Sequence, residues 1–401
     1  MSILVVNAGS SSVKFGLFRF DTLEPVARGV LDWGAIEQNS GADRAVLTLT
    51  PQSGEPLRRE LDAPDYRHGV IAALAVLEQA GYTAAGSEIR VTGHRLIHGG
   101  EEIRRPVRID AAMKETIARY AHLAPLHIPP GLEAVAATEA ALPGVPQVGV
   151  FDTAFFADVP PHAYLYPLPY EWYEDWGIRR YGFHGTSHAY CTGRAAEMLR
   201  RALADLRLIV CHLGQGSSAT AVRDGVAVTN TMGYTPLEGF MMGTRCGTVD
   251  PGILLHVQRE HGLSVEQLDD VLHHKSGLLG LSGISSDFRR VEAAAADGHR
   301  RARLALDVYA YRVRTTIGAL AAAIGGVDAV VFTGGIGENS AWLRSEACRG
   351  LEFLGLRLDD SRNADCRPDA DISAADAPVR VLVIHTREDL MIAREARRLV
   401  S

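Results

Sequence analysis

Three short segments rich in glycine, serine and asparagine could hold a phosphate group. They are 7–12 (NAGSSS), 212–216 (HLGQG) and 334–339 (GGIGEN), and each follows a short apolar run. Backbone N–H groups in such turns can approach phosphate oxygens, and serine hydroxyls add donors. One such segment alone is better explained as a simple chain reversal, but three at strand ends favour a phosphate-binding site. No GxxxxGK[ST] motif and no complete GxGxxG after a strand is present, which argues against a Walker loop and a dinucleotide fold.

Two arginines lie among glycines and apolar residues rather than on a charged surface stretch. Arg95 is part of TGHRLIHGG (92–100), and Arg245 is part of GFMMGTRCG (239–247). A guanidinium in such surroundings can bind a carboxylate or a phosphate through two parallel hydrogen bonds. A structural ion pair is an equally good explanation for either arginine taken alone.

A histidine and three carboxylates complete the set of residues that could do chemistry. His184 precedes a predicted helix, with Ser187 as its expected N-cap, and could donate a hydrogen bond to an anionic transition state. Taken alone, a histidine at this position is more often a structural residue with its hydrogen bonds satisfied. Asp152 ends an apolar strand, where it could bind a metal or orient a nucleophile. Glu388 and Asp389 stand between a strand and the last helix, and helix capping explains them as simply as a metal site does.

The elements that position these residues form two similar series. In the first half, strands are predicted at 3–6, 13–18, 26–31, 45–50, near 94–95 and at 147–151, and helices at 66–80, 111–123 and 132–142. In the second half, strands are predicted at 206–211, 219–222, 226–229 and 329–332, and helices at 265–273 and 300–324. Asp224-Gly225 predicts a tight hairpin, and 390–400 a final helix. The repeated order indicates two duplicated α/β halves that face one another across a cleft, although two unrelated α/β domains would give the same pattern.

The composition narrows the function classes. The chain has 401 residues, 47% hydrophobic and 22% charged, which fits a globular protein of two or three domains. The net charge of −7 argues against nucleic-acid binding. Five cysteines without a CxxC pair argue against a zinc site and fit a reducing compartment. We expect no signal peptide and no membrane span, and therefore a cytoplasmic protein.

Taken together, these segments resemble the acetate kinase family, among the actin-like and sugar-kinase-like ATPases. The resemblance runs nearly end to end, and its most specific strings are 7–14, 93–95, 182–188, 235–239, 242–245, 276–280, 285–287 and 332–339. It implies an α/β fold of two ribonuclease H-like domains related by duplication, with the active site in a cleft between them. The expected domains are 1–151, on which a terminal helix at 387–401 packs, and 152–386. It further implies ATP:acetate phosphotransferase activity with Mg²⁺ or Mn²⁺, a homodimer, and acetate, acetyl phosphate, ATP and ADP as ligands.

The resemblance assigns a role to each matching position. Catalytic roles fall to Arg95, Asp152, His184 and Arg245, and metal binding to Asn7 and Glu388. The acetate pocket would consist of Arg95, Ile97, Leu126, His127, Phe183 and Pro236. The nucleotide and phosphate site would consist of Ser10, Ser12, Lys14, His212, Leu213, Gly214, Gln215, Gly216, Asp287, Phe288, Arg289, Gly335, Ile336, Gly337, Glu338 and Asn339.

The sequence departs from the family pattern at several positions near these residues. Ile128 and Gly131 each replace an asparagine, Phe156 replaces a histidine, and 246–249 (CGTV) differs from the usual SGDI. Gln215 replaces the asparagine of a phosphate turn, which predicts altered nucleotide affinity or donor choice. Arg387 replaces an asparagine before Glu388, which predicts altered metal or phosphate binding. The residues with catalytic roles are retained, and we therefore expect an active kinase with altered constants.

Three other functions fit parts of the sequence. A kinase for propionate or butyrate would share the chemistry, but the size of Ile97 favours acetate, with propionate as a secondary substrate. A non-catalytic ATP-binding relative is disfavoured because Arg95, His184, Asp152, Arg245 and Glu388 are all present. No feature specifically supports a filament-forming actin-like protein.

Overall fold

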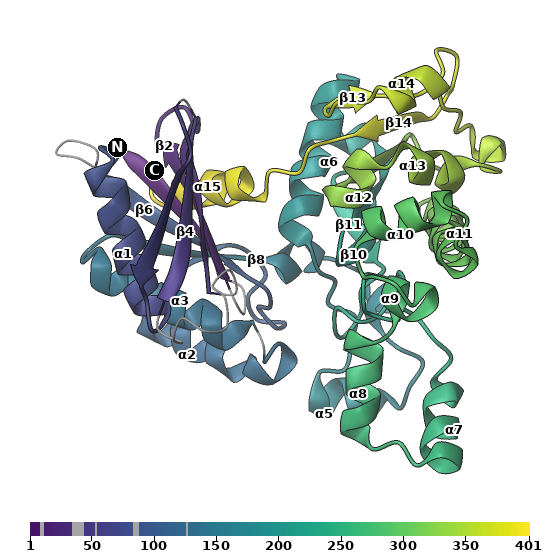
Figure 1. Cartoon of the computed structure of the whole chain (residues 1–401), viewed down its shortest axis with the longest axis horizontal. Coiled ribbons are helices and arrows are strands. Elements are labelled where there is room, and N and C mark those ends of the chain that lie inside the picture. Colours follow the sequence, from purple (N-terminus) through teal and green to yellow (C-terminus); the bar gives the residue numbers. More distant parts are fainter. Residues whose placement is uncertain (9–11, 34–43, 53, 83–87, 126) are drawn as a thin grey trace. The chain divides into compact units, whose positions relative to one another are not determined.

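The computed structural model describes residues 1–8, 12–33, 44–52, 54–82, 88–125 and 127–401, and the chain divides into two compact units (Figure 1). Unit 1 comprises 1–157 and 387–401, and unit 2 comprises 158–386. The boundary expected at 151/152 therefore lies six residues later, because the 3₁₀ helix Asp152–Phe156 remains with the strand that precedes it.

Unit 1 is built on one mixed sheet with the strand order β5-β4-β3-β2-β1-β6-β8-β7. The strands are β1 (Ser2–Ala8), β2 (Ser12–Arg19), β3 (Pro25–Asp32), β4 (Arg44–Pro51), β5 (Leu57–Asp62), β6 (Ile89–Leu96), β7 (Val107–Arg108) and β8 (Gln147–Phe151). The helices are α1 (Tyr66–Gln79), α2 (Ala111–Arg119), α3 (Ile128–Ala141) and α15 (Glu388–Arg398). The strands β1, β6 and β8 are parallel, so their carboxyl ends lie at one edge of the sheet.

The alternation of β1 explains how this sheet acquires helices on both faces. Leu4 and Val6 point to the side covered by α1 and α3, and Ile3 and Val5 point to the side covered by α15. All four side chains are buried, each contributing roughly 1.5–3 kcal/mol by removal from water. The C-terminal helix α15 thus closes the core of unit 1, which Figure 1 shows as the yellow helix against the purple sheet.

Unit 2 has a second mixed sheet with the order β11-β10-β9-β12-β14-β13. Its strands are β9 (Arg207–Leu213), β10 (Ser217–Arg223), β11 (Val226–Asn230), β12 (Ala329–Thr333), β13 (Ala370–Asp371) and β14 (Arg380–Val383). Its helices are α4 (Pro161–Tyr164), α5 (Tyr170–Trp176), α6 (Gly185–Leu199), α7 (Pro251–His261), α8 (Val265–His274), α9 (Gly277–Ser282), α10 (Phe288–Ala296), α11 (Arg300–Ala323), α12 (Gly334–Asn339), α13 (Ala341–Cys348) and α14 (Asp360–Ala364). The main core joins the sheet to α9, α10, α11 and α13, and α6 packs on β9 and β12.

The two sheets share one topology. In each, three antiparallel strands are followed by two parallel ones and a short antiparallel edge strand, so that β3-β2-β1-β6-β8-β7 corresponds to β11-β10-β9-β12-β14-β13. Strands β4 and β5 extend the first sheet only. The duplication expected from the sequence is therefore present as a repeat of strand order and direction.

Most of the predicted elements are confirmed, and three expectations are wrong. The predicted strand 147–151 and hairpin turn Asp224-Gly225 are as observed, with positive φ at both turn residues. The segment 334–339 is a short helix, α12, rather than a turn. The N-cap of α6 is His184 instead of Ser187, because the helix begins three residues earlier than expected. The helix predicted over 111–123 is interrupted at Tyr120, where a 3₁₀ turn replaces it.

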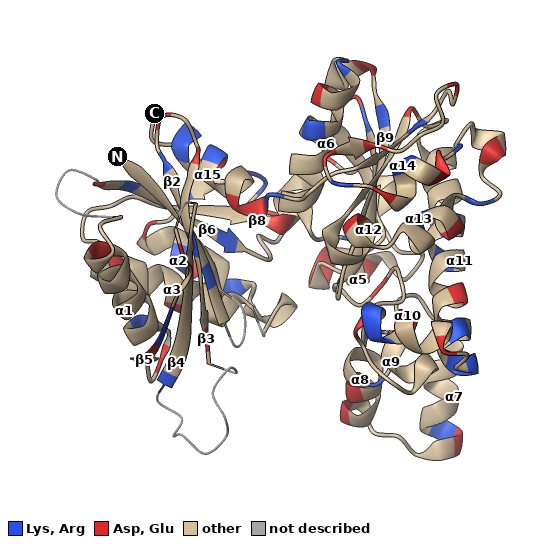
Figure 2. Ribbon diagram, turned by 45° about the horizontal axis from the view of Figure 1, so that its top comes forward, with Lys and Arg blue, Asp and Glu red and all other residues tan. Residues whose placement is uncertain are grey.

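The surface charges of both units are mixed. Figure 2 shows Lys and Arg interspersed with Asp and Glu over each unit. Among the described residues, no helix combines the length and the apolar character needed to cross a membrane.

Candidate active site

In unit 1, an arginine and two carboxylates gather where β6, β8 and α15 meet. Arg95 donates from Nε and Nη2 to the two carboxylate oxygens of Asp152, over 3.3 and 2.7 Å. Its Nη1 lies 3.9 Å from Glu388 Oε2. Arg95 is near the end of β6 and Asp152 directly follows β8, so the parallel strands bring them together.

The Arg95 guanidinium is permanently charged in this environment. Burial alone would lower its pKa, but the neighbouring Asp152 and Glu388 carboxylates outweigh burial and raise it. The Asp152 side chain is 1% exposed and forks with the guanidinium in a bidentate pair. Asp152 can therefore fix the direction of Arg95, whose remaining nitrogen points toward Glu388.

The first hairpin supplies polar residues at the same edge of the sheet. Asn7 and Lys14 are directly opposed in the β1–β2 ladder, so their side chains share one face. In the parallel β1–β6 pair, Val6 aligns with His94, which makes Asn7 and Arg95 the next residues along the two strands. Ser12 begins β2 and is partly buried. The predicted site residue Ser10 lies outside the described residues.

In unit 2, His184 occupies the N-cap of α6 in a conformation that directs its ring. Its φ of 59° is in the left-handed region, which is uncommon for a residue with a side chain. Nδ1 of His184 and Nε2 of His188 lie 2.9 and 2.7 Å from the same hydroxyl, Ser218 Oγ. Burial, with a further contribution from His212, holds the pKa of His188 well below its usual value. His188 is therefore neutral, and Ser218 fixes the Nδ1 edge of His184.

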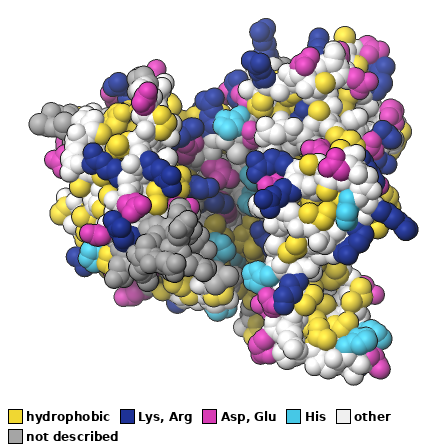
Figure 3. Space-filling view, viewed as in Figure 1, with side chains coloured by type: hydrophobic (Ala, Val, Ile, Leu, Met, Phe, Trp, Pro, Cys, Tyr) yellow, Lys and Arg dark blue, Asp and Glu magenta, His cyan; other side chains and the backbone are white. Residues whose placement is uncertain are grey.

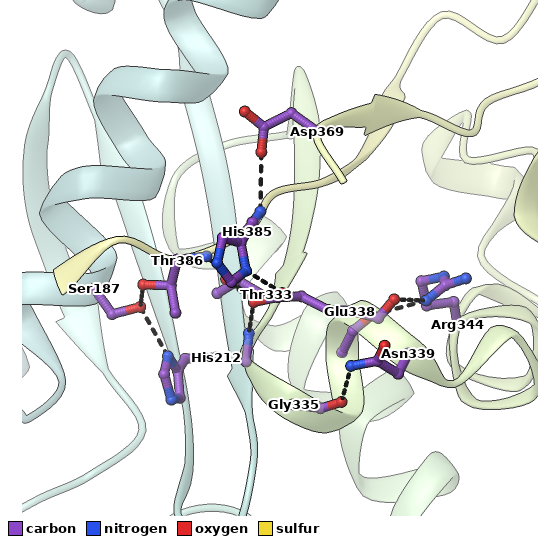
Figure 4. Close-up of polar contacts among 12 residues, drawn as sticks. Ser187, His212, Thr333, Gly335, Glu338, Asn339, Arg344, Asp369, His385 and Thr386 are labelled. Carbon is purple, nitrogen blue, oxygen red and sulfur yellow. Dashed lines mark hydrogen bonds and ion pairs between the residues drawn. The ribbon is translucent and has the colours of Figure 1, made fainter. Parts of the chain in front are cut away.

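A third histidine, His212, stacks on His184 and is held by a chain of two hydroxyls. His212 Nδ1 lies 2.8 Å from Ser187 Oγ, which lies 2.8 Å from Thr386 Oγ1 (Figure 4). The rings of His184 and His212 stack with centroids 4.4 Å apart. Strand β9, helix α6 and the segment after β14 thus each contribute to one hydrogen-bonded network.

Arg245 and His184 converge on the backbone of Gly216. A Cβ placed on Gly216 would lie 2.8 Å from Arg245 Nη2 and 3.3 Å from His184 Nε2. Arg245 also donates from Nη1 to the carbonyl of Pro236 over 2.7 Å. Burial lowers the pKa of Arg245, but a guanidinium stays charged in a protein. A cation and an imidazole therefore flank the turn that follows β9.

The first segment of unit 2 that is expected to bind nucleotide lies at the end of β9. Gly214, Gln215 and Gly216 form the turn between β9 and β10, and the Gly214 N–H donates to Gly216 O over 3.1 Å. The Gln215 carbonyl accepts from the Gly243 N–H over 3.2 Å, joining the turn to the loop of Arg245. Leu213 is buried in the core at the end of β9.

Helix α12 begins directly after β12 and is fastened by Glu338. One Glu338 oxygen accepts from the Gly334 and Thr386 N–H groups over 3.0 and 3.2 Å, and the other lies 2.7 Å from His385 Nδ1 (Figure 4). Burial raises the pKa of Glu338, but these partners together lower it. Gly335 and Asn339 are exposed, and Asn339 donates to the Gly335 carbonyl over 2.8 Å. Ile336 packs on the core, and Gly337 is buried.

The third expected nucleotide segment opens α10. Asp287 caps this helix by accepting from the Arg289 N–H over 2.9 Å, and its carboxylate pairs with the exposed Arg289 guanidinium. Phe288 is 4% exposed and packs edge to face on Tyr309. Of this group, Arg289 has the side chain accessible to a ligand, while Phe288 belongs to the core.

The residues expected to form the acyl pocket are divided between the units. In unit 1, Ile97 packs beside the cluster around Leu96, and His127 is the N-cap of α3. In unit 2, Phe183 is 2% exposed, and Pro236 contacts Arg245 through its carbonyl. Leu126 lies outside the described residues.

Five residues of these networks were not singled out for a site role from the sequence, namely Ser187, His188, Ser218, His385 and Thr386. Ser187 and Ser218 orient the histidines, and His385 and Thr386 hold Glu338 and Ser187. Ser218 is the second residue of β10 and is fully buried, where a hydroxyl requires a partner. That requirement was the one signal in the sequence, and it does not identify the partner.

Comparison with known proteins identifies the relatives of this chain. Residues 2–394 match the model of the acetokinase family. An acetate kinase of Cyanothece sp. is 47% identical over 410 residues, covering 100% of this chain and 99% of that protein. The crystal structure of Porphyromonas gingivalis acetate kinase is similar with a TM-score of 0.93 at 41% identity, over 100% of both chains. A propionate kinase structure from Francisella tularensis has a TM-score of 0.91 at 36% identity, over 99% of both. The whole-length match and the shared arrangement of elements show that this chain belongs to the acetokinase family.

Proposed function

We propose that this protein reversibly transfers the γ-phosphoryl group of ATP to acetate, forming acetyl phosphate and ADP by direct in-line displacement. The observation that carries the proposal is the convergence of the Arg245 guanidinium and the His184 imidazole on the Gly216 backbone. The second support is a charged arginine, Arg95, held in a fixed direction by Asp152.

The chemistry needs cations more than it needs a base. Acetate, with a pKa close to that of a carboxyl side chain, is ionised at neutral pH and is already a nucleophile. The obstacle is the approach of one anion to another in a site from which water is excluded. Fixed cationic donors offset this repulsion, and deletion of one comparable donor costs roughly 3 kcal/mol of transition-state stabilisation.

Each proposed site residue has its own role in phosphoryl transfer. Arg95 binds the acetate carboxylate and the transferred phosphoryl from the side of unit 1, with Asp152 as its orienting partner. Arg245 and His184 Nε2 donate to the phosphoryl oxygens from the side of unit 2. Ser218 keeps the Nδ1 edge of His184 occupied, which fixes the ring. The resemblance to the family assigns the methyl pocket to Ile97, Leu126, His127, Phe183 and Pro236.

A divalent cation fits the donor set of unit 1. Asn7 and Glu388 offer an amide oxygen and a carboxylate, which are the oxygen ligands that Mg²⁺ and Mn²⁺ prefer. Among the described residues, no three His, Cys, Asp or Glu side chains are grouped as a metal site. Two protein ligands suit Mg²⁺, which usually keeps several waters and binds substrate phosphates. When bound, the cation neutralises charge on the phosphates.

The nucleotide phosphates are proposed to lie against the turn 214–216 and the first turn of α12. Backbone N–H groups at both places suit anionic oxygens. The remaining nucleotide contacts are assigned to Ser10, Ser12 and Lys14 in unit 1, and to His212, Asp287 to Arg289 and Gly335 to Asn339 in unit 2.

A homodimer is proposed for the assembly. Unit 2 exposes large apolar side chains on helices that carry little of its core. Ile253 and Leu255 on α7 are each 52% exposed, and Trp176 on α5 is 60% exposed. Figure 3 shows hydrophobic side chains on the surface over α7 and α8.

A cytoplasmic location is proposed because all five cysteines are free thiols.

A second candidate substrate is propionate, because a propionate kinase is among the similar structures over nearly the whole chain. One additional methylene changes binding by about 1–3 kcal/mol in an apolar pocket. Rates with acetate, propionate and butyrate therefore separate the two candidates as a ratio of kcat/KM.

The test is a hydroxylamine trap for acyl phosphate. Purified protein, ATP and Mg²⁺ are incubated with each acid, and hydroxamate is measured by its iron complex. We expect the highest kcat/KM with acetate, and loss of product when ATP or the metal is omitted. Absence of hydroxamate with all three acids would overturn the proposal, and a preference for propionate would replace the substrate.

A further inference from the structure

Three side chains of unit 2 form a charged cluster outside the proposed site. Arg180 donates from Nη2 to Glu238 Oε1 over 2.6 Å, and Tyr166 donates its hydroxyl to Glu238 Oε2. Both carboxylate oxygens of Glu238 are thereby occupied. Burial raises the pKa of Tyr166, and the bond to Glu238 raises it further against the effect of Arg180. The phenol therefore remains a donor. We call these three residues the Arg180 cluster.

The Arg180 cluster also holds backbone. Nη1 of Arg180 lies within 3.0–3.1 Å of the carbonyls of Asn230, Thr231 and Met232. The Tyr234 N–H donates to the Tyr166 oxygen over 2.9 Å. Glu238 lies 58 positions after Arg180 and 72 after Tyr166, so the cluster joins separate parts of the chain to one another.

Gly233 shows how closely the backbone approaches the cluster. A Cβ at this position would overlap Glu238 Oε2 and Tyr166 Oη. The Gly233 carbonyl accepts from the Tyr181 N–H over 3.0 Å. The chain therefore passes the cluster with no room for a side chain, and it is bonded to the residue that follows Arg180.

The site residues His184 and Arg245 lie on two separate segments, and each segment is held near the Arg180 cluster. His184 lies four residues after Arg180, and Arg245 lies in the run 231–250, which contains no helix or strand. An irregular run of this length has no ladder of its own to fix it. Arg245 is anchored to the Pro236 carbonyl, two residues before Glu238. The Arg180 cluster is thus close in sequence to His184 through Arg180, and to Arg245 through Glu238.

We propose that Arg180, Glu238 and Tyr166 are positioning residues, which hold the His184 segment and the Arg245 loop in register so that both donors meet at Gly216. They touch neither substrate nor metal. This role rests on the proposed function. Its expected signature is a loss of kcat, because a displacement of about 1 Å at the reacting centre can cost roughly 100-fold in rate.

The test compares variants in the acyl phosphate assay. Arg180→Met and Glu238→Ala are each expected to lower kcat by roughly 10- to 100-fold, with KM for ATP and acetate changed less than about threefold. The double variant is expected to lose no more than about threefold beyond either single one, because both act through one contact. Arg180→Lys keeps the charge without the fork and should recover part of the rate.

The matched control is Arg380→Met. Arg380 donates from Nε and Nη2 to Asp371 over 2.9 and 2.7 Å, at an exposure similar to that of the Arg180–Glu238 pair. It belongs to β14, and its partner to β13. We expect its kcat to stay within about twofold of wild type, even if its melting temperature falls, because loss of one ion pair changes stability by a few kcal/mol at most.

Two milder variants keep the test decisive if Arg180→Met does not fold. Tyr166→Phe removes one hydroxyl, and Gly233→Ala pushes on Tyr166 and Glu238 without removing a contact. Both should lower kcat by at least roughly threefold with KM unchanged. If folded variants keep wild-type kcat, or if only KM rises, the positioning role is overturned while the wild-type rate still supports the kinase. A wild type that makes no acyl phosphate overturns both.

Discussion

Helices α6 and α15, which follow β8 and β14 along the chain, begin with residues of different chemistry. After β8, the chain passes through α4 and α5 to α6, which packs on the sheet of unit 2, and after β14 it passes to α15, which packs on the sheet of unit 1. The two connections are counterparts in a duplicated topology. Yet α15 begins with Glu388 and Asp389, whereas α6 begins with Gly185, Thr186 and Ser187 behind the His184 N-cap.

The electrostatics of a helix N-terminus explain what this difference achieves. The positive end of the dipole stabilises carboxylates in the first turn, and Asp389 is further paired with Arg28 over 2.9 Å. At α15 the carboxylates of Glu388 and Asp389 therefore occupy this positive end. Because Asp389 is paired with Arg28, Glu388 is the carboxylate suited to a cation. At α6 the first turn has no carboxylate, so the same end suits a substrate anion. Duplication supplied two equivalent helix starts, and the residues give them opposite charge preferences.

Substitution at the α6 start should produce the largest effect. We expect His184→Ala to lower kcat by roughly 100- to 1,000-fold, the loss seen when one transition-state donor is removed. KM for ATP should change little, and the Mg²⁺ concentration for half-maximal rate should stay the same. His184→Asn, which can still donate, is the matched variant and should recover part of the rate. A loss that excess Mg²⁺ reverses would contradict the assignment of anion chemistry to α6.

Substitution of Glu388 at the start of α15 should instead lower the rate in a way that depends on the Mg²⁺ concentration. Glu388→Gln is expected to lower the rate by roughly 10- to 100-fold at low Mg²⁺, the loss typical of weakened metal binding. The rate should recover as the Mg²⁺ concentration is raised. Asp389→Asn is the neighbouring control, because its carboxylate pairs with Arg28. Metal titrations of both variants check the prediction. An equal loss at every Mg²⁺ concentration would remove the contrast between the two helix starts.

The turn between β9 and β10 tests how tightly the donors of unit 2 are placed. Gly216→Ala adds one methyl that would approach Arg245 Nη2 at 2.8 Å and His184 Nε2 at 3.3 Å. We expect kcat to fall by about 10-fold through displacement of both donors. Gly318→Ala in α11, where no atom lies within 4 Å of the added methyl, is the control. It should keep full activity and gain up to about 1 kcal/mol of stability from helix propensity. Full activity of Gly216→Ala would show that the donors can move without cost.

Local patterns predicted the parts of the fold that local physics determines. β8 is a continuous apolar run between polar residues, and it was predicted with its observed bounds. Asp224-Gly225 satisfies the positive φ of a two-residue hairpin by residue type alone. By contrast, 334–339 contains three glycines and was predicted as a turn. Its helix is fastened by Glu338, which accepts from both Gly334 and the distant Thr386.

The candidate site shows the same division. The pair of Arg95 and Asp152 follows from two adjacent parallel strands. Asp152 was singled out because it ends an apolar strand, and Arg95 because it lies among glycines and apolar residues. The meeting of Arg245 with His184 at Gly216 depends on the path of the irregular run 231–250, which has no periodicity to read. Its anchors are side chains such as Arg180, whose partner Glu238 is 58 residues away. That the clusters of the two units act on one phosphoryl group stays a prediction.

The smallest effect concerns the stability of β6, whose counterpart β12 is apolar along most of its length. His94 on β6 is buried beside Gln147, and burial lowers its pKa to about 4. The imidazole is ordinarily protonated near pH 6.5 in an unfolded chain, so between these values the unfolded state binds a proton that the folded state excludes. Stability should therefore be complete above pH 6.5 and fall by about 1.4 kcal/mol per pH unit below it, until the folded state also protonates near pH 4.

Replacing the imidazole tests this difference between the strands. His94→Gln removes the titrating group and keeps a polar side chain near Gln147 and Thr138. We expect the variant to be less stable than wild type at pH 7.5, and the gap to narrow by roughly 1–2 kcal/mol at pH 5. Urea unfolding at both pH values measures it. A gap that stays constant would mean that the pKa of His94 is the same in the folded and unfolded states, and that β6 tolerates charge where β12 has no polar group before Thr333.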